Sequence, residues 1–504
     1  MTIPNLAIPP LTRPVGHPLP ASGERDGVRG AAIMTKRLIP ILIAAVLAGC
    51  AVTQPVVPKY DLPQGSATAA QNELLEHWWT AFNDPVLNTL IDEAFANNLD
   101  LKLALTRIDA ARSQVLLAQS NLVPSVDLVG NGSRSRISAR TSPPLPSGVG
   151  QTSNDFNISM QVSYELDVWG KYRAGLLAAD NDLLASRYYR ETVRITVAGD
   201  VASAYFRLRA ADAELKVLQD TLKLRTDTVR LQHDRFEGGI IGEYDLRSAE
   251  AERSAVVADV ARAEKAIGQL ESAIATLTGR SPRAVYTPEV ARGASIDDVT
   301  EVPQLPSGLP SGLLERRPDI RRTEALMAAS DLRIQQARAN YFPSLTLTGA
   351  FGWESAAMSS LFSPSAMIWN IGLGLVQPLF ALKAIEAQVE LAKARNAETE
   401  VLYAQTVQVA FREVHDALVA NRSARDVLAA ETDRRDQISK AYEVAVLRYD
   451  AGRTSFLEVI DAQRQLLSAE TLRIGAARDA KLSIVDFAKS LGGGWSPEQY
   501  ADAR

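Results

Sequence analysis

The chain repeats one arrangement of sequence motifs. Residues 118–130 (AQSNLVPSVDLVG) correspond to residues 337–349 (ARANYFPSLTLTG), with Asn, Pro, Ser, Leu and Gly in register. Further along, 235–239 (RFEGG) corresponds to 448–452 (RYDAG). A period this long that occurs only twice indicates a duplicated domain and not a solenoid of many short repeats. Each copy is therefore expected to supply the same elements: an incoming helix, a pair of strands, and a hairpin of two helices.

Four segments alternate apolar and polar residues, which is the pattern of strands with one apolar face. They lie at about 125–136, 155–165, 344–354 and 366–377. Their length matches a tilted strand that crosses a bilayer, although the strands of a soluble β-sandwich alternate equally well. Four strands cannot close a barrel, and open strand edges in lipid would leave backbone groups without hydrogen bonds. Strands in a membrane would therefore need further copies of the chain to complete the barrel.

Two stretches without proline, 171–234 and 381–448, carry apolar residues at spacings of three and four, which predicts helices. Each helix would be about 95–100 Å long at ~1.5 Å per residue, far longer than a globular domain is wide. Glycines follow both stretches, Gly238 and Gly239 in the first copy and Gly452 in the second, and predict left-handed residues at the turns. A second helix then returns in each copy, which gives helical hairpins at about 168–279 and 380–491.

Cys50 is the only cysteine, so a disulfide within the chain and a paired-cysteine metal site are excluded. It follows a segment, 34–49, with a basic start, a short apolar run and small residues before the cysteine, which is typical of a signal peptide. The ending LAGC resembles a bacterial lipoprotein signal, in which the cysteine becomes the lipidated first residue, and Ala51 then favours the outer membrane. The alternative is a conventional signal with an incidental cysteine. Residues 1–33 precede a complete signal and are expected to be an upstream extension.

Composition and motifs exclude several functions. The formal net charge is −5, whereas a nucleic-acid-binding protein needs a basic face. The histidines of the mature part lie far apart, and the sequence has no zinc-protease, phosphate-loop, nucleophile-elbow or dinucleotide-binding motif. We expect neither an enzyme nor a metal site, and no cofactor other than the lipid on Cys50.

Proline, glycine and serine concentrate between the two copies, as in PQLPSGLPSG, which marks a joint without regular structure. The resulting division is an N-terminal segment at 50–84, a first repeat at 85–279, a linker at 280–312, a second repeat at 313–493 and a tail at 494–504. Nearly the whole mature chain is thus assigned to the duplicated frame.

Short motifs occur in a fixed order along this frame. They are Trp78 and Trp79 with Phe82, Asp84 and Pro85, then ERRPDIR at 315–321, YDAG at 449–452, FLEVIDAQ at 456–463 and LGGGW at 491–495. In these motifs, and over roughly residues 50–495, the chain resembles the TolC-like outer-membrane factor family, most closely its lipoprotein efflux branch. The resemblance implies a mainly α fold that forms a trimer. Its membrane β-barrel takes four strands from each chain and continues as a long α-helical tunnel in the periplasm.

The resemblance also implies a function and partners. Members of the family are passive exit ducts of the outer membrane, which periplasmic adaptor proteins connect to inner-membrane transporters. The lipid anchor and the LGGGW ending favour a transporter of the resistance-nodulation-division type. The alternatives are the outer-membrane component of a type I protein secretion system, a periplasmic adaptor, or a trimeric structural surface protein. The substrate stays open among drugs, metals, solvents and proteins.

By the same resemblance, the duct narrows at the helix turns, where the returning helix of the second copy carries apolar and acidic residues. The matching residues are Leu457, Glu458 and Asp461. Glu458 and Asp461 share one helical face, so three chains would gather their carboxylates around one axis, where they repel anions and attract cations. The alternative is that both acids are solvated near a helix N-terminus. The first copy keeps one acid, Asp245, and has Ser248 in place of Asp461.

Two further predictions concern the ends of the duct. The turn residues expected to contact the adaptor are Gly238, Gly239, Gly452 and Arg453. Three arginines near the outer mouth indicate attraction of anions or simple solvation: Arg134, Arg136 and Arg140.

Overall fold

The computed structural model describes residues 75–138, 140, 150–297 and 316–496. The chain divides into two units, Met1–Ala51 and Val52–Arg504, and all of the described residues belong to the second. The predicted upstream extension, the signal segment, Cys50 and part of the linker lie outside the described residues.

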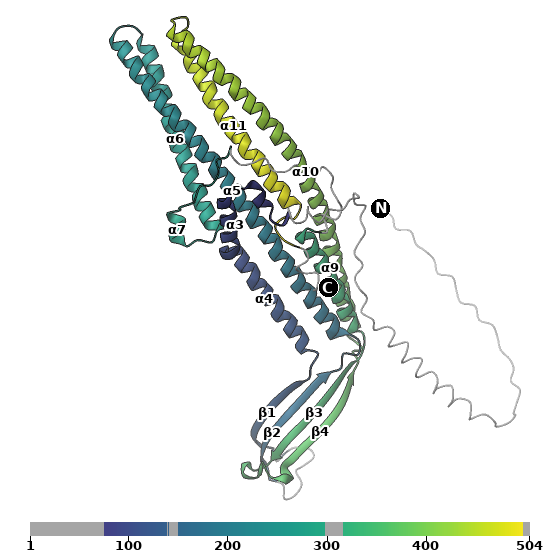
Figure 1. The fold of residues 1–504 in the computed structure, drawn as a ribbon. Helices are drawn as coiled ribbons and strands as arrows, with labels where there is room; N and C mark the ends of the chain where they lie inside the picture. Colours follow the sequence, from purple (N-terminus) through teal and green to yellow (C-terminus); the bar gives the residue numbers. More distant parts are fainter. Residues whose placement is uncertain (1–74, 139, 141–149, 298–315, 497–504) are drawn as a thin grey trace, which may run out of the picture. The chain divides into compact units, whose positions relative to one another are not determined.

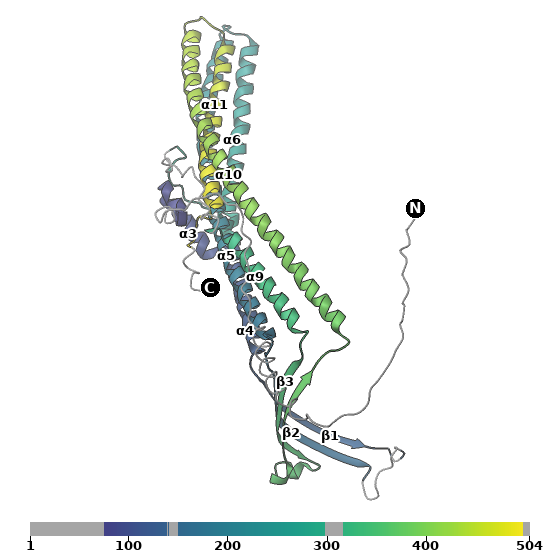
Figure 2. The same ribbon diagram turned by 90° about the vertical axis from the view of Figure 1, so that its right-hand side faces the viewer.

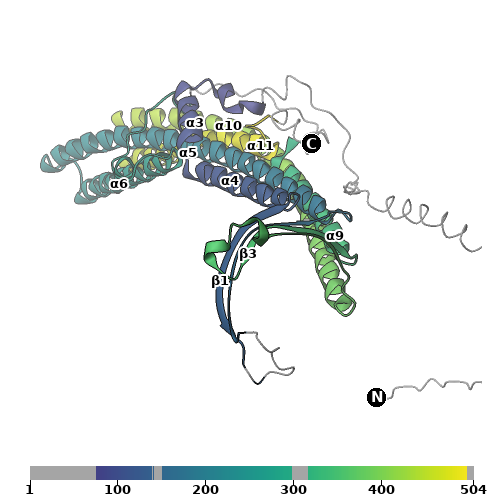
Figure 3. The same ribbon diagram turned by 90° about the horizontal axis from the view of Figure 1, so that it is seen from below.

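Four antiparallel strands form one sheet in the order β1-β2-β3-β4 (Figure 1). Their bounds are β1 Ser125–Arg136, β2 Thr152–Glu165, β3 Ser344–Ser355 and β4 Met367–Val376. β2 begins before residue 155 because Thr152 still pairs with Arg136, although neither side chain belongs to the apolar alternation. Viewed from below, the sheet is curved (Figure 3). β1 and β4 are its edge strands, and each has one side without a partner strand in the described chain.

The register of the strands gives the sheet an apolar and a polar face. One row across the four strands consists of Leu128, Met160, Phe351 and Trp369. Neighbouring rows of the same face add Val126, Ile158, Val162, Trp353, Leu347, Ile371, Leu373 and Leu375. Because successive side chains point to opposite sides, the other face is polar and small, with a row of Asp127, Gln161, Ala350 and Asn370. Trp369 is 72% exposed and Ile371 79%, so the described chain itself does not cover the apolar face.

Two helical hairpins follow the strand pairs (Figure 1). The first consists of α5 Lys171–Glu237 and α6 Glu243–Leu277, and the second of α10 Leu382–Asp450 and α11 Phe456–Ser490. In the part of the chain that the structure describes, no helix is both long and apolar enough to cross a membrane. α5 has 67 residues, which corresponds to about 100 Å at 1.5 Å per residue. Both hairpin turns lie at the end away from the sheet (Figures 1 and 2).

The two hairpin turns have the same backbone. Gly239 and Gly452 both have a φ of +67°, the left-handed conformation that glycine adopts without steric cost. In each turn the residue after the glycine donates its N–H to a carbonyl five residues earlier, at 2.8 Å. Gly238 has a φ of −75°, so only Gly239 of the glycine pair is the left-handed cap.

The remaining helices are α3 Pro85–Asn97, α4 Leu99–Ser120, α7 Pro282–Tyr286 and α9 Pro318–Ala339, with the 3-10 helices η1 Trp78–Phe82, η2 Met358–Ser360 and η3 Pro364–Ala366. Of these, α4 and α9 pack beside the helices of the hairpins and form a wall with them. On the sheet side the order of neighbours is α4, α5, α9, α10 (Figure 2). On the turn side the contacts give the order α6, α5, α11, α10. The wall therefore ends at α4 and α6 on one side and at α10 on the other.

The main core lies where α5 meets η1 and α3. Tyr205 and Phe206 are fully buried, and the Phe206 ring is 4.7 Å from that of Phe82. Asp84 accepts a backbone N–H of α3 at 2.9 Å and the Tyr205 hydroxyl at 2.5 Å. Gly293 donates its N–H to the same hydroxyl at 3.1 Å, and a Cβ there would lie 2.2 Å from Asp84 Oδ1. The motif that contains Phe82 and Asp84 is thus explained by packing and helix capping.

Candidate functional site

The start of α11 presents a face that no part of the described chain covers. Leu457, Glu458 and Asp461 are exposed, whereas Val459 and Ile460 are buried. The helical period places these two sets on opposite sides of α11. The three predicted constriction residues therefore share one free surface, and their role at a constriction stays a prediction.

Glu458 has partners within its own hairpin. Arg448 Nη1 lies 3.1 Å from Glu458 Oε1, and the Thr454 hydroxyl donates to the other carboxylate oxygen. Because both charged side chains are about half exposed, the ion pair contributes at most about 1 kcal/mol. Asp461 accepts only from the uncharged Gln465 Nε2 among the contacts found in the described chain, at 2.7 Å. The charge of Asp461 also contributes to raising the pKa of Arg464. Among the described residues, Glu458 therefore has a direct ion pair, whereas Asp461 interacts with a neighbouring cation without one.

The turn of the first hairpin has a different chemistry. Asp245 lies in the first turn of α6 and is half-buried. Nearby, Arg247 pairs with Glu243 at 3.2 Å and with Glu250 at 3.0 Å. These ion pairs run along α6 itself. The counterpart of Leu457 is Tyr244, which is 72% exposed, so the first turn has an exposed aromatic side chain and a half-buried acid where the second has an exposed leucine and two exposed acids.

The tips of both turns are accessible. Gly238, Gly239, Gly452 and Arg453 are all exposed. The two tips lie at the same end of the hairpins (Figure 1). They are available to a partner protein, and contact with an adaptor stays a prediction.

Tyr449 connects the two hairpins close to the turns, which sequence analysis missed. Arg235 Nη1 donates to its hydroxyl at 2.5 Å, and Gln232 Nε2 donates at 3.2 Å. The Arg235 guanidinium carbon also lies 5.3 Å from the Tyr449 ring centroid, within the range of a cation–π contact. The signal in the sequence is small: the counterpart of Tyr449 in the first copy is Phe236, which has no hydroxyl.

Glu252 forms a second connection, between α5, α6 and α11. Arg464 Nε donates to Glu252 Oε1 at 2.7 Å, and Arg225 Nη2 lies 3.5 Å from Glu252 Oε2. Burial lowers the pKa of Arg225, which is 2% exposed, and the charge of Glu252 partly offsets this. Hydrogen bonding to Glu252 raises the pKa of Arg464. This cluster could not be predicted from the sequence, because its members come from helices that meet only in the folded chain.

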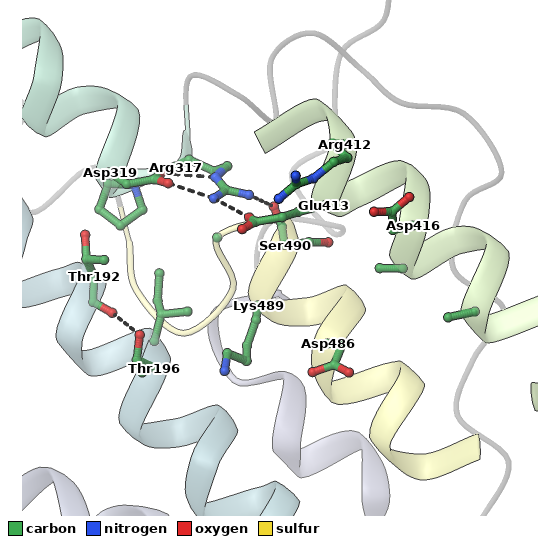
Figure 4. Close-up of a pocket in the computed structure, with 15 residues that line it drawn as sticks. Thr192, Thr196, Arg317, Asp319, Arg412, Glu413, Asp416, Asp486, Lys489 and Ser490 are labelled. Atoms are coloured by element: carbon green, nitrogen blue, oxygen red, sulfur yellow. Dashed lines mark hydrogen bonds and ion pairs between the residues drawn. The ribbon is translucent and has the colours of Figure 1, made fainter. Parts of the chain in front are cut away.

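A cavity of about 680 Å³ lies between α5, α9, α10 and α11. Figure 4 shows Arg317 at its edge, between Asp319 of α9 and Glu413 of α10. Arg317 Nη2 is 2.7 Å from a carboxylate oxygen of each, and Nη1 donates to Ser490 O at 2.8 Å. Burial lowers the pKa of Arg317, but hydrogen bonds to the two acids outweigh it and raise the pKa overall. Arg317 is therefore a fixed positive charge that joins three helices.

The ERRPDIR and LGGGW motifs contact each other around this cavity. Arg316 Nη2 donates to Trp495 O at 3.2 Å. Gly492 has a φ of +70°, and Gly494 donates its N–H to Leu75 O at 2.9 Å. These motifs fasten the start of the second repeat to its end, so their role in the described chain is structural.

Comparison with known proteins agrees with this architecture. The family described as outer membrane efflux protein matches residues 90–280 and 309–493, one match in each repeat. The chain is 31% identical over 477 residues to a protein of Pseudomonas putida described as probable efflux pump outer membrane protein TtgC, covering 92% of this chain and 96% of that protein. It is 29% identical over 467 residues to the cation efflux system protein CusC of Escherichia coli, covering 91% and 99%.

A solved structure, the CmeC outer membrane channel of Campylobacter jejuni, has a similar fold. Its TM-score is 0.80 at 28% identity, with 87% of this chain and 95% of that chain covered. A duplicated chain with four membrane strands and two helical hairpins defines the class of outer-membrane channel subunits. The chain belongs to the outer membrane efflux protein family. This confirms the family resemblance and the predicted fold class.

Proposed function

We propose that three copies of this chain form a passive exit duct, which carries small molecules through the outer membrane and across the periplasm for a tripartite efflux system. One observation carries the proposal: the sheet and the helical wall are open on the same two sides of the chain. β1 lies on the side of α4 and α6, and β4 lies on the side of α10. Head-to-tail contact of these sides repeats around a ring and leaves no free edge.

Both kinds of edge need such a neighbour. Unpaired backbone groups of β1 and β4 in lipid would cost several kcal/mol each. The free helices carry exposed apolar side chains, which are Leu99, Leu103, Leu116 and Leu117 on α4 and Val401, Val419 and Leu447 on α10. A second copy would remove these side chains from water at roughly 25 cal/mol per Å². The exposed apolar face of the sheet then faces lipid, and the polar face lines the duct.

The gate of the duct would lie at the helix turns. Leu457, Glu458 and Asp461 form the uncovered face of α11 near the second turn. Three such faces around one axis make an acidic and apolar constriction, to which Asp245 of the first repeat adds one carboxylate from each chain. Because carboxylates favour cations and disfavour anions, the closed duct would block anions most.

The partners follow from the same arrangement. The exposed turns at Gly238, Gly239, Gly452 and Arg453 would contact a periplasmic adaptor protein, which connects the duct to an inner-membrane transporter of the resistance-nodulation-division type. A lipid on Cys50 would add an anchor in the outer membrane. Because a passive duct supplies no energy for transport, we expect the transporter that loads it to determine the substrates.

Planar-bilayer recording of the purified oligomer tests the proposal. We expect a trimer by native mass spectrometry and a small, cation-preferring conductance. Replacing both acids of the proposed gate, Glu458→Ala with Asp461→Ala, should raise the conductance and reduce the preference for K⁺ over Cl⁻. A matched control, Glu386→Ala with Glu390→Ala on α10 near the sheet, removes the same charge and should change both quantities little.

Two results would count against the proposal in different ways. A monomer without conductance would overturn the duct itself. A conducting trimer in which the gate pair and the control pair behave alike would overturn only the assignment of the constriction.

A further inference from the structure

Two arginines at the outer end of β1 lie on the apolar face of the sheet, not on the polar face. Arg134 and Arg136 have the same parity along β1 as Leu128, so all three side chains point to one side. Their partners on β2 are Asn154 and Thr152. The arginines were predicted from sequence to lie near the outer mouth, and the register now shows that they face away from the duct.

The arginines begin where the apolar rows end. The last apolar row contains Gly132 and its partner Phe156, whose ring lies 3.4 Å from the place of a Cβ on Gly132. At about 3.3 Å per residue, Arg134 lies ~7 Å and Arg136 ~13 Å further along the strand. The polar headgroup layer on each side of a bilayer is roughly 5–8 Å thick. Because a strand that crosses a membrane is tilted by about 45°, these distances along the strand correspond to ~5 Å and ~9 Å along the membrane normal. Arg134 is therefore at headgroup depth, and Arg136 is at the outer border of that layer, where its long side chain can reach the headgroups.

No acidic side chain compensates these charges nearby. The sequence from Leu128 to Asn154 has no Asp or Glu. Asp155 pairs with Ser133 and lies on the opposite face of the sheet. Both arginines are exposed, and Arg136 Nη2 donates only to the neutral Gln151 Oε1 among the contacts found in the described chain, at 3.1 Å.

The second strand pair lacks this feature. Residues 344–382 contain no Lys or Arg. Their acid, Glu354, pairs with Asn157 and lies on the polar face. The outward positive charge therefore comes from the first repeat alone.

We propose that Arg134 and Arg136 form an outward-facing site for phosphate groups on the lipid headgroups of the outer leaflet, such as those of a phosphorylated glycolipid. The guanidinium fork binds phosphate through two parallel hydrogen bonds. Two such groups about 7 Å apart on one face engage two phosphates of one headgroup, or of two neighbouring lipids. In a ring of three copies, the three β1–β2 pairs that bind lipid alternate with three β3–β4 pairs that carry no positive charge. This inference rests on the proposed function, because it needs the sheet to lie in the outer membrane.

The test compares lipid retention by the full-length trimer in nanodiscs of phosphatidylcholine with and without bis-phosphorylated lipid A. Arg134→Gln with Arg136→Gln should lower bound lipid A roughly tenfold or more, since each basic residue near an anionic surface contributes about 1 kcal/mol. Binding of phosphatidylcholine should not change. Arg230→Gln with Arg262→Gln, two exposed arginines on the hairpins, removes the same charge and should leave lipid A binding unchanged.

A second variant tests the direction of the side chains. Residues 133–136 read SRSR, so exchanging each serine with the next arginine gives RSRS, with the same composition and the arginines on the polar face. This variant should lose lipid A as the glutamine variant does. Retention of lipid A by either variant at the level of the parent protein would overturn the inference.

Two further measurements identify the source of the bound phosphate and the state of the duct. Inorganic phosphate at millimolar concentration should not protect the site or displace lipid A, and full displacement would assign the site to soluble phosphate. Conductance of the same nanodisc samples after transfer to bilayers reports on the duct. A protein that neither inserts nor conducts refutes the proposed function, whereas a conducting trimer with unchanged lipid A binding refutes only this inference.

Discussion

The turns of the two hairpins end their long helices with the same glycine conformation, a φ of +67° at Gly239 and Gly452. Their side chains act differently. Arg235 of the first hairpin reaches across to Tyr449 of the second, whereas Arg448, its counterpart, pairs with Glu458 of its own hairpin. The first hairpin faces the second within the chain, and the outer side of the second is free for a neighbouring copy. The two copies thus share the left-handed glycine that the turn requires. Their side chains differ because each hairpin faces a different neighbour.

Among substitutions at the contacts between the two hairpins, replacement of Glu252 is expected to lower the stability most. Glu252→Ala leaves the guanidinium of Arg225 buried without its carboxylate, and Arg464 also loses its partner. Breaking a buried ion pair from one side costs about 3 kcal/mol. We expect faster hydrogen exchange in α5 and α6 around residues 225 and 252, and a lower denaturation midpoint of the helical signal.

Gln465 is the matched control for Glu252, because it occupies the corresponding position of the second repeat. Gln465→Ala removes an exposed side chain whose contact is a hydrogen bond to Asp461, so a change within about 0.5 kcal/mol is expected. Equal losses of stability from the two substitutions would show that the Glu252 cluster does not hold the two hairpins together.

A smaller effect is expected for Tyr449→Phe, which makes the second turn resemble the first. The substitution removes the acceptor of Arg235 and of Gln232, whose side chain is 1% exposed. Loss of a hydrogen bond to a charged donor costs about 1.5–3 kcal/mol. A double-mutant cycle with Arg235→Gln should return a coupling energy of at least about 1 kcal/mol. The reverse substitution, Phe236→Tyr, should have no measurable effect, and a coupling energy near zero would mean that the short contact does not hold the hairpins together.

The strands, the hairpins and their turns could be predicted because each depends on local pattern. Period-two alternation fixes a strand, a stretch without proline permits a long helix, and a glycine such as Gly452 permits a left-handed cap. The contacts of Tyr449 and Glu252 could not be predicted, because they join residues from different repeats whose relative position follows from helix packing. The direction of Arg134 needed the strand register, which one sequence does not give. The same holds for Glu458, whose partner Arg448 lies ten residues away across the turn.

The smallest effects separate the two glycines of the first turn. Gly239→Ala places a side chain on a left-handed residue, which costs about 1–2 kcal/mol although no atom lies within 4 Å of the new Cβ. Gly238→Ala should instead stabilise by about 0.4–1 kcal/mol, because alanine suits its helical φ and restricts the unfolded chain. The second turn supplies a natural precedent, since Ala451 occupies the position of Gly238 and has a φ of −80°. Hydrogen exchange of the turn amides measures both changes in one experiment. If Gly239→Ala destabilises the turn and Gly238→Ala stabilises it, the φ angles that the two turns share determine which residues each position accepts. If both substitutions change the stability in the same direction, these φ angles do not govern the stability of the turns.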